Sequence, residues 1–366
     1  ERVGDVAGVE LVDRNRFLDE VATMEAVGEP RSQDPEDVAV LLFTSGTTGD
    51  PKAAILRHRH LTSYVISTVE FMGADEREAS LVSVPPYHVA GISAVLSGTF
   101  AGRRTVYLES FSPERWVRAA TQEGITHAMV VPTMLGRILD HLDDSQGRLP
   151  ELRHLSYGGG RMPLEVLERA LDMLPQVDFV NAYGLTETSS TISILGPAEH
   201  RAAHASDDPA VRRRLHSVGR PLPGVEVTVR DPLGAIQPAG EEGEVWVRGE
   251  QVAGEYVGRA GSSDGAGWFA TRDGGWFDDE GYLYLTGRLD DVIVRGGENI
   301  SPGEVEDVLR RHPAVSDVCV VGTPDEEWGE VVAAVIVLAE GAAATEDELR
   351  DWVRANLRSS RTPGRF

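Results

Sequence analysis

The sequence has 366 residues, of which 41% are hydrophobic and 26% are charged, and its formal net charge is −24. This length and composition predict a globular chain of two or three domains, or a large domain joined to a small one. The acidic charge argues against binding to nucleic acid or to an anionic membrane surface. The single cysteine, Cys319, excludes an internal disulfide; within the apolar run 318–321 we expect a buried, inert thiol.

The sequence shows neither a pattern for a membrane-spanning helix nor a pattern for export. No stretch approaches the roughly 20 apolar residues of a spanning helix, and the first residues lack a signal-peptide pattern. We therefore expect a cytoplasmic protein.

The first functional signal is the stretch Leu42-Phe-Thr-Ser-Gly-Thr-Thr-Gly-Asp-Pro-Lys52. The apolar run 38–43 predicts a strand, and it ends in hydroxyl-bearing and glycine residues. Hydroxyls and backbone N–H groups suit anionic oxygens, glycines allow close approach, and Lys52 adds a positive charge. The stretch predicts a phosphate-holding loop; a glycine-rich turn between strands is the alternative. Its glycine spacing, with a proline before the lysine, does not fit the Walker loop.

Strands and helices alternate in the next part of the chain. The predicted strands are 81–84, 104–108, 127–131 and the start of 155–160, which enters a glycine turn at 158–160. The predicted helices are 60–72, 91–98, 113–123, 132–142 and 163–174. This alternation indicates βαβ units and a largely parallel sheet. The runs 225–230 and 244–249 instead alternate with period two, which predicts antiparallel strands of a smaller sheet or barrel.

Several histidines invite a functional interpretation. His88 follows a strand at a proline-rich turn, where either a structural or a functional role fits. His200 and His204 have helical spacing in a polar segment that we expect to be a loop or surface helix, and His216 lies nearby. A zinc site there is disfavoured because the carboxylate that would complete a known zinc signature is missing.

The second signal is the segment Asp178-Phe-Val-Asn-Ala-Tyr-Gly-Leu-Thr-Glu-Thr188, a strand that ends in a polar turn. An aromatic ring such as Tyr183 can stack on a purine. The hydroxyl of Thr186 can bond a phosphate, and the carboxylate of Glu187 can hold the Mg²⁺ that accompanies ATP. A polar strand end without function is the alternative interpretation.

The third signal runs from Gly267 to Pro302. Asp273 can accept hydrogen bonds from both ribose hydroxyls, and Arg288 can donate to ribose or phosphate. From Ser301 the pattern changes to a compact α+β unit. Ser301 and Thr345 each stand three residues before a glutamate, so each predicts a capping box at the start of a helix. Strands are expected at 315–321 and 331–338 between these helices.

Taken together, the three motifs resemble those of the adenylate-forming superfamily, which comprises acyl- and aryl-CoA synthetases, adenylation domains of peptide synthetases, and luciferases. The motifs occur in the family order from Val38 onward, and the form of the last one is most like an acyl-CoA synthetase. The resemblance implies an α/β fold: a large N-terminal domain with a mostly parallel sheet and a smaller β-subdomain, then a hinge and a small α+β domain. The expected boundaries are a partial N-terminal adenylation domain, 1–289, and a partial mobile C-terminal domain, 290–366.

The resemblance also implies roles for individual residues. Those expected to bind ATP or AMP are Thr44, Ser45, Gly46, Thr47, Thr48, Gly49, Gly158, Gly159, Gly160, Asn181, Ala182, Tyr183, Gly184, Asp273 and Arg288. Those expected to act in catalysis are Lys52, His88, Thr186 and Glu187, with Glu187 also the Mg²⁺ ligand. Asp290 is expected at the hinge, and Gly296, Gly297 and Glu298 at the CoA tunnel.

The implied reaction is ATP-dependent ligation of a small carboxylic acid to CoA through an acyl-adenylate, with Mg²⁺ as cofactor. An apolar acid of moderate size is expected, near His88, residues 131–134 and the glycines 158–160. Three alternatives remain open: thioester formation from a supplied acyl-adenylate, loading of a carrier protein, and nucleotide or acyl-adenylate binding without catalysis. The sequence also leaves a homodimer open.

Three departures from the family pattern bear on these alternatives. The chain looks truncated at both ends, because the long N-terminal region and the catalytic lysine near the C-terminus are both missing. A fragment of a longer protein is one explanation, and a member that performs part of the reaction is the other. In addition, Arg272 stands where the family has glycine, beside Asp273.

Overall fold

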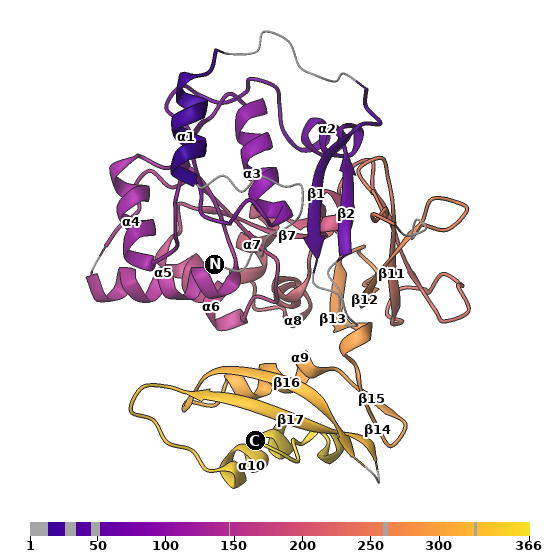
Figure 1. Cartoon of the computed structure of the whole chain (residues 1–366). Helices are drawn as coiled ribbons and strands as arrows, with labels where there is room; N and C mark the ends of the chain where they lie inside the picture. The colour runs from indigo at the N-terminus through magenta and orange to yellow at the C-terminus, as the bar shows by residue number, and fades with distance from the viewer. Residues whose placement is uncertain (1–13, 26–33, 45–51, 146, 259–262, 326–327) are drawn as a thin grey trace.

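The computed structural model describes residues 14–25, 34–44, 52–145, 147–258, 263–325 and 328–366. Figure 1 shows an α/β part, a β-rich part beside it and a smaller C-terminal part below. The large sheet has the order β4-β3-β5-β6-β7-β8-β9. Its strands are β3 (Ala79–Val82), β4 (Arg104–Tyr107), β5 (His127–Val130), β6 (His154–Gly158), β7 (Asp178–Leu185), β8 (Ser190–Leu195) and β9 (Arg220–Pro221).

The first five of these strands are parallel, and β8 and β9 are antiparallel. The predicted α/β fold is therefore confirmed. The connecting helices are α3 (Val89–Phe100), α4 (Pro113–Gln122), α5 (Pro132–Ser145) and α6 (Leu164–Met173). Helices α4, α5 and α6 contact one another in turn, whereas α3 contacts α2 (His58–Thr68). The crossover from β3 to β4 runs in one direction across the sheet, and those from β4 to β5, β6 and β7 run in the other. Because each crossover is right-handed, α3 covers one face and α4–α6 cover the other.

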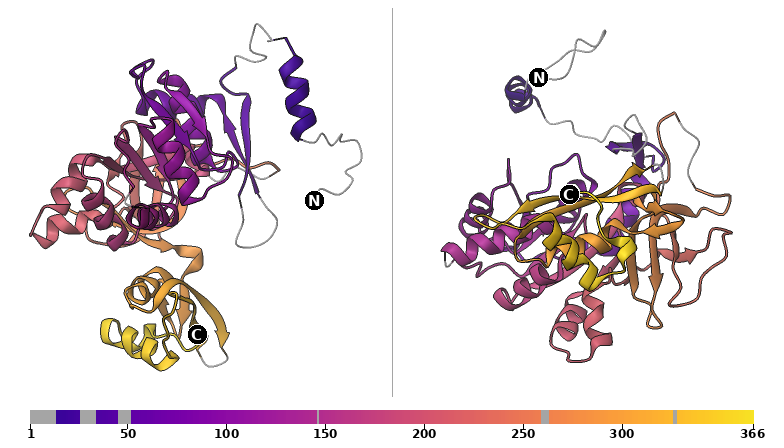
Figure 2. Two further views of the ribbon diagram at one scale, coloured as in Figure 1. Left: turned by 90° about the vertical axis from the view of Figure 1, so that its left-hand side faces the viewer. Right: turned by 90° about the horizontal axis from the view of Figure 1, so that it is seen from below.

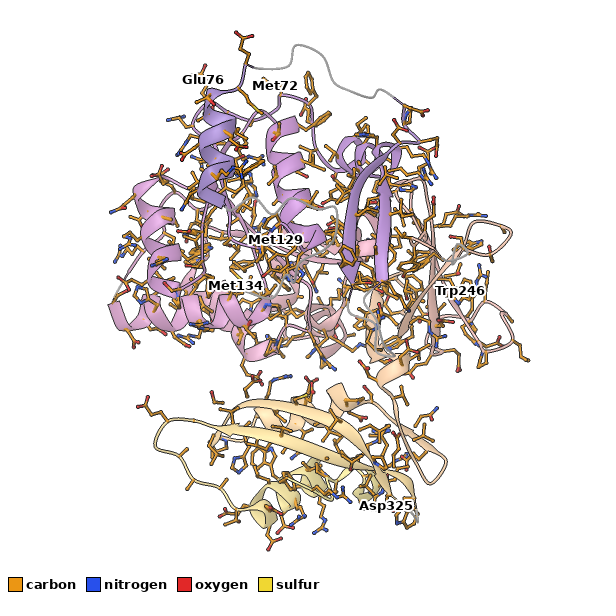
Figure 3. All side chains as sticks on the ribbon, in the orientation of Figure 1. Met72, Glu76, Met129, Met134, Trp246 and Asp325 are labelled. Atoms are coloured by element: carbon orange, nitrogen blue, oxygen red, sulfur yellow. The ribbon has the colours of Figure 1, made fainter. Side chains whose placement is uncertain are left out.

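The α/β core is made by large side chains buried between the sheet and α4–α6. Trp116, Tyr157 and Phe179 are fully buried there, together with Leu135 of α5. Burying an aromatic side chain of this size contributes about 1.5–3 kcal/mol. Met134, marked in Figure 3, also belongs to this core rather than to an open pocket wall.

The N-terminal elements are helix α1 (Arg14–Thr23) and the hairpin β1 (Val38–Thr44) and β2 (Lys52–Arg57). The hairpin is antiparallel, and Thr44 pairs with Lys52 at its end. The loop Ser45, Gly46, Thr47, Thr48, Gly49 lies outside the described residues. The polar segment after β8 forms helices α7 (Pro197–His204) and α8 (Pro209–Arg212), followed by the 3₁₀ turn η2 (Arg213–His216).

The predicted smaller sheet is also confirmed. It has the order β10-β11-β12-β13 and is antiparallel throughout. Its strands are β10 (Glu226–Arg230), β11 (Gly243–Arg248), β12 (Phe269–Phe277) and β13 (Leu283–Arg288). On the outer side, where Figure 3 marks Trp246, the guanidinium of Arg230 lies 4.7 Å from that ring and 4.5 Å from Trp268.

The C-terminal part is an α+β unit that follows the 3₁₀ turn η3 (Leu289–Asp291). Its sheet has the order β15-β14-β17-β16, and the left view of Figure 2 shows this part below the rest of the chain. The elements are β14 (Ile293–Arg295), β15 (Glu298–Ile300), α9 (Pro302–Arg310), β16 (Val315–Asp325), β17 (Gly329–Leu338), α10 (Glu346–Asn356) and η4 (Ser359–Arg361). Helices α9 and α10 contact each other, and their apolar side chains share one core with the sheet.

Two predictions about this unit are wrong. Cys319 is exposed, because β16 alternates: Val318 and Val320 point to the helices, and Cys319 points to the open face. The capping box at Ser301 does not form, since its hydroxyl donates to the carbonyl of Thr286 at 2.6 Å. The capping box of Thr345 is confirmed. None of the helices in the described ranges is long and apolar enough to cross a membrane.

Candidate active site

The candidate site lies where the parallel strands of the large sheet end. The carboxyl ends of parallel strands meet at one edge, and ligands bind there in open α/β sheets. Gly158 ends β6, and a Cβ on it would lie 2.2 Å from the carbonyl oxygen of Ala182 on β7. Only glycine permits this close approach, and Gly159 follows with a φ of +75° that also favours glycine. The predicted glycine turn is thus shaped by contact with β7.

Tyr183, Asp273 and Arg288 form a hydrogen-bonded group between the two sheets. The hydroxyl of Tyr183 donates to Oδ2 of Asp273 at 2.6 Å, and Nη1 of Arg288 donates to Oδ1 at 2.9 Å. Tyr183 and Asp273 are buried. The residues predicted to bind adenine and ribose are therefore brought together, from β7, β12 and β13.

Burial sets the electrostatics of this group. It raises the pKa of the Asp273 carboxyl, while the hydrogen bond from Tyr183 and the charge of Arg288 oppose the rise. Burial also raises the pKa of the Tyr183 hydroxyl, so this group stays protonated and acts as a donor. For Arg288, burial alone would lower the pKa, but the neighbouring Asp273 outweighs it. The result is a buried carboxyl group held by two fixed donors.

Glu187 lies in η1 (Thr186–Thr188), directly after β7, and is 9% exposed. Its Oε1 accepts a hydrogen bond of 2.5 Å from the hydroxyl of Tyr256. Among the described residues, no cationic side chain lies within ion-pair distance of Glu187. A buried carboxylate without a cationic partner is costly, and carboxylate oxygen is a preferred Mg²⁺ ligand, so this residue fits a metal site.

The turn around Glu187 is strained and firmly held. Ser189 and Ser190 have φ values of 57° and 122°, which non-glycine residues seldom adopt. Nε2 of the buried Gln251 donates to the carbonyls of Thr188 and Thr191 at 3.0 and 2.7 Å. Such strain persists only when its surroundings fix it, and it is concentrated at functional sites.

The other predicted residues of β7 have structural contacts. Nδ2 of Asn181 donates to the carbonyl of Ser217 at 3.0 Å. Gly184 allows the backbone of Ser190 to approach, since a Cβ there would lie 1.8 Å from its carbonyl oxygen. Thr186 is half-buried, and its carbonyl accepts from the amide of Ser189 at 3.1 Å.

Strand β2 of the phosphate-loop hairpin contacts η1, the turn that carries Glu187. The hydroxyl of Thr44 donates to the carbonyl of Lys52 at 3.3 Å. The ammonium of Lys52 lies 5.9 Å from the centre of the Tyr256 ring, and that same tyrosine contacts Glu187. Lys52 and Glu187 are therefore connected through a residue that lies in none of the three sequence motifs.

His88 is exposed at the start of α3, and its ring lies 4.8 Å from that of Tyr87. No described contact joins it to Glu187 or Asp273. His200 and His204 have other partners: Nε2 of His200 meets the hydroxyl of Tyr157 at 2.8 Å, and Nε2 of His204 meets Asp172 at 2.8 Å. The tautomer that fits His200 donates from Nδ1 to the carbonyl of Gly196.

Arg272 points away from Asp273, because neighbours on β12 alternate between its faces. Its side chain is 55% exposed and lies 2.7 Å from Asp290 and 3.6 Å from Glu244. Its φ is 64°, a left-handed conformation that suits glycine better. The residue that departs from the family pattern is thus paired with the predicted hinge.

The predicted CoA loop is the turn of the β14–β15 hairpin. Gly296 and Gly297 have φ values of 57° and 85°, as a two-residue turn with positive φ at both positions requires. The amide of Gly296 donates to the carbonyl of Trp328, and Glu298 lies 4.0 Å from Arg361. All these contacts lie within the C-terminal part, so this structure does not bring the loop to Asp273 or Glu187.

Residues 2–257 match the AMP-binding enzyme family, and residues 304–366 match the AMP-binding enzyme C-terminal domain. The chain belongs to the AMP-binding enzyme family. The order of the two matches fits the resemblance seen in the motifs.

Individual relatives agree with this AMP-binding family membership. The chain is 36% identical over 332 residues to a feruloyl-CoA synthase of Amycolatopsis sp, covering 90% of this chain and 65% of that protein. It is 33% identical over 348 residues to the fatty acid–[acyl-carrier-protein] ligase ScoC of Streptomyces coeruleorubidus, covering 92% and 65%. The solved structure of O-succinylbenzoate coenzyme A synthetase (MenE) of Bacillus subtilis, in complex with ATP and magnesium ion, aligns with a TM-score of 0.81 and 30% identity, covering 95% and 70%. The chain thus spans about two thirds of the length of these AMP-binding relatives.

Tyr256 and Gln251 are the contacts that sequence reasoning missed. Both lie between β11 and β12, in a segment without a phosphate-type or metal-type pattern. Only the tertiary fold brings this segment to Glu187, so no local signal in the sequence could have identified it.

Proposed function

We propose that this chain carries an ATP-dependent carboxylic acid:CoA ligase that works through an acyl-adenylate and then a CoA thioester. The observation that carries the proposal is the group of Tyr183, Asp273 and Arg288, which lies at the carboxyl edge of the sheet with Glu187 on the same strand end. The carboxylate of Asp273 would bind ribose and that of Glu187 would bind a metal ion, and this combination suits a nucleoside triphosphate. The feruloyl-CoA synthase relative supports CoA as the acceptor.

Nucleoside binding is assigned to the hydrogen-bonded group. Each carboxylate oxygen has two lone pairs, so Asp273 keeps acceptor capacity for ribose hydroxyls after bonding Tyr183 and Arg288. The turn Gly158–Gly160 would lie against adenine, where the absence of side chains leaves room for a flat base. Asn181, Ala182 and Gly184 would support this surface through the backbone of β7.

Phosphate binding is assigned to the residues around Tyr256. Lys52 and Thr44, with the loop 45–49, would hold the phosphates, and Thr186 would donate from its hydroxyl. Glu187 would hold Mg²⁺, an assignment supported by its burial without a cation and by the MenE complex with ATP and magnesium ion. When bound, Mg²⁺ would neutralise charge on the phosphates.

The chemistry makes a poor electrophile reactive. An oxygen of the substrate carboxylate attacks the α-phosphorus of ATP and the bond to pyrophosphate breaks, giving an acyl-adenylate. The sulfur of CoA then attacks the acyl carbon, AMP leaves, and the thiol proton passes to solvent. The chain's contribution is to position the reactants and to stabilise phosphoryl charge. His88 would line the pocket of the carboxylic acid.

The second half-reaction requires a different arrangement of the parts. Rotation about Asp290, at the boundary between 1–289 and 290–366, would bring the Gly296–Gly297 turn and Glu298 to the acyl-adenylate. A turn without side chains suits the narrow CoA pantetheine arm. The cytoplasmic location and the homodimer remain predictions.

One alternative acceptor has support of its own. The relative ScoC is a fatty acid–[acyl-carrier-protein] ligase, so a carrier-protein thiol is the second candidate. The half-reaction and the non-catalytic binder are tested by the same experiment.

The test is product analysis of the 366-residue chain with Mg²⁺-ATP, CoA and a panel of aromatic and aliphatic carboxylic acids, reading pyrophosphate and acyl-CoA separately. Both products with one acid class are expected. Pyrophosphate without acyl-CoA would favour a carrier protein, and thioester only from supplied acyl-adenylate would favour the half-reaction. Nucleotide binding with neither product would contradict the proposed ligase. Glu187→Gln should lower turnover by roughly two orders of magnitude or more without unfolding the chain.

A further inference from the structure

Residues 253–257 connect two chain segments of the candidate phosphate site: the turn that carries Glu187 and the hairpin that carries Lys52. The amide of Ala253 donates to the carbonyl of Glu187 at 2.7 Å. Further along, the amide of Ile55 donates to the carbonyl of Glu255 at 3.0 Å, and the amide of Val257 donates to the carbonyl of Ala53 at 2.9 Å. The segment therefore extends the β1–β2 hairpin by backbone pairing while its start is fixed to the turn after β7.

An ion pair holds the middle of this segment. Nε and Nη2 of Arg57 donate to the two carboxylate oxygens of Glu255 at 3.1 and 2.7 Å. A two-point arginine–carboxylate pair adds orientation as well as energy. Because successive side chains of an extended segment point to opposite sides, fixing Glu255 also fixes the direction of Tyr256.

The side chain of Tyr256 has two functions in this position. Its hydroxyl, 2.5 Å from Oε1 of Glu187, occupies one carboxylate oxygen and leaves Oε2 for another ligand. Its ring lies 5.9 Å from the ammonium of Lys52, within the range of a cation–π contact. One half-buried residue therefore touches both the anion and the cation predicted to hold the phosphates.

We propose that Tyr256 is a positioning residue of the nucleotide site: its hydroxyl orients the carboxylate of Glu187 toward Mg²⁺, and its ring keeps Lys52 beside the phosphates. The inference rests on the proposed function and deepens it. A carboxylate with one oxygen fixed has fewer orientations to lose when it binds a metal, so the hydroxyl favours the bound state.

Equilibrium binding of ATP to the full chain, titrated with Mg²⁺, tests this without relying on turnover. Tyr256→Phe keeps the ring and removes the hydroxyl. It should raise the half-saturating Mg²⁺ concentration by about three- to tenfold, as loss of one ordinary protein hydrogen bond predicts. ATP binding without Mg²⁺ should stay within about twofold of wild type, because the cation–π contact remains. Tyr256→Leu should weaken that binding as well.

The matched control is Tyr107→Phe, which removes the hydroxyl of a tyrosine that is 65% exposed on β4. It should leave the Mg²⁺ dependence unchanged. A double-mutant cycle with Glu187→Gln adds a readout that general destabilisation would not produce. The effect of Tyr256→Phe on Mg²⁺ should disappear when residue 187 is glutamine, because the oriented carboxylate is gone.

The outcomes separate two kinds of failure. One result would contradict the role of Tyr256 alone. In that result, ATP binding to the wild type depends on Mg²⁺, Glu187→Gln abolishes this dependence, and Tyr256→Phe leaves the half-saturating Mg²⁺ concentration unchanged. The proposed function would then stand. An equal effect of Tyr256→Phe with glutamate or glutamine at 187 would also overturn the role. If Glu187→Gln itself leaves the Mg²⁺ dependence unchanged, the metal assignment of the proposed function fails.

Discussion

The hydroxyl of Tyr183 on β7 lies 2.6 Å from Oδ2 of Asp273 on β12, so one short hydrogen bond joins the large sheet to the smaller one. Tyr183→Phe removes the donor and leaves a buried carboxylate partly unsatisfied. We expect unfolding free energy to fall by about 1–3 kcal/mol and ATP affinity to fall with it. Urea unfolding and equilibrium ATP binding measure the two effects.

The control for this substitution is Tyr284→Phe, which removes a weaker tyrosine–aspartate bond of 3.3 Å on the neighbouring strand β13. It should cost less stability and leave ATP binding unchanged. Equal loss of ATP affinity in both variants would show that the Tyr183 hydroxyl has no specific role at the nucleotide.

The glycine turn after β6 gives a second prediction. A Cβ at Gly158 would lie 2.2 Å from the carbonyl oxygen of Ala182, whereas at Gly160 the nearest atoms are 3.9 Å away. Gly158→Ala must push β6 from β7, so we expect a loss of about 1–3 kcal/mol in unfolding free energy. Gly160→Ala is the matched control and should change stability by less than about 1 kcal/mol. Similar melting temperatures for the two variants would contradict the close approach.

The junction between the α/β part and the C-terminal part gives a third prediction. Arg161, next to the glycine turn, lies 2.5 Å from Asp307 on α9, and burial raises the pKa of that carboxyl. Asp307→Asn removes the charge while keeping the shape. The C-terminal part should then separate more often from the rest, which small-angle scattering would detect as a larger radius of gyration.

Asp347 serves as the control for Asp307, because it pairs with Arg350 at 2.8 Å within α10. Asp347→Asn should leave the scattering profile unchanged, since exposed pairs of this kind contribute about 0–1 kcal/mol. A profile for Asp307→Asn that matches this control would rule out the ion pair as a docking contact.

A fourth prediction concerns pH. The hydroxyl oxygen of Thr126 lies within hydrogen-bond distance of Nδ1 of His127, at 2.8 Å. Burial lowers the pKa of His127 from 6.5 to about 3. Between these values the unfolded chain binds the proton and the folded chain does not. Stability therefore rises with pH across this window and is lost as the pH falls below 6.5. The contribution approaches about 1.4 kcal/mol per pH unit.

His127→Gln should reduce the slope of this dependence, measured as urea unfolding at about pH 7.5 and about pH 5. Part of the slope should remain, because burial also lowers the pKa values of His60 and His200 to about 4. The control is His58→Gln, at an exposed histidine of α2, which should keep the wild-type slope. A wild-type slope in His127→Gln would mean that folding does not lower the pKa of His127.

Local signals in the sequence predicted the fold well, and tertiary contacts account for the misses. The alternation of strands and helices predicted the parallel sheet, and the spacing of Thr345 and Glu348 predicted a helix cap that forms. The same spacing failed at Ser301, because a neighbouring strand offered Thr286 as a partner. A run of apolar residues also could not reveal which face of β16 is covered, so Cys319 was misplaced.

The residues of the candidate site also fall into those that local signals predicted and those that only tertiary contacts reveal. Asp273 and Arg288 were paired from the sequence through their motif, and they meet in the structure on adjacent strands. Tyr256 could not be found, because its contacts to Lys52 and Glu187 arise from chain segments about 200 and 70 residues away.

The open face of the C-terminal sheet has a practical consequence. The sequence contains one cysteine, and its thiol is exposed on that face, on the part of the chain expected to rotate. A maleimide fluorophore would therefore attach at Cys319 alone, without removal of other thiols. Its polarisation and emission, followed while nucleotide and then CoA are added, would report the movement of the C-terminal part in real time.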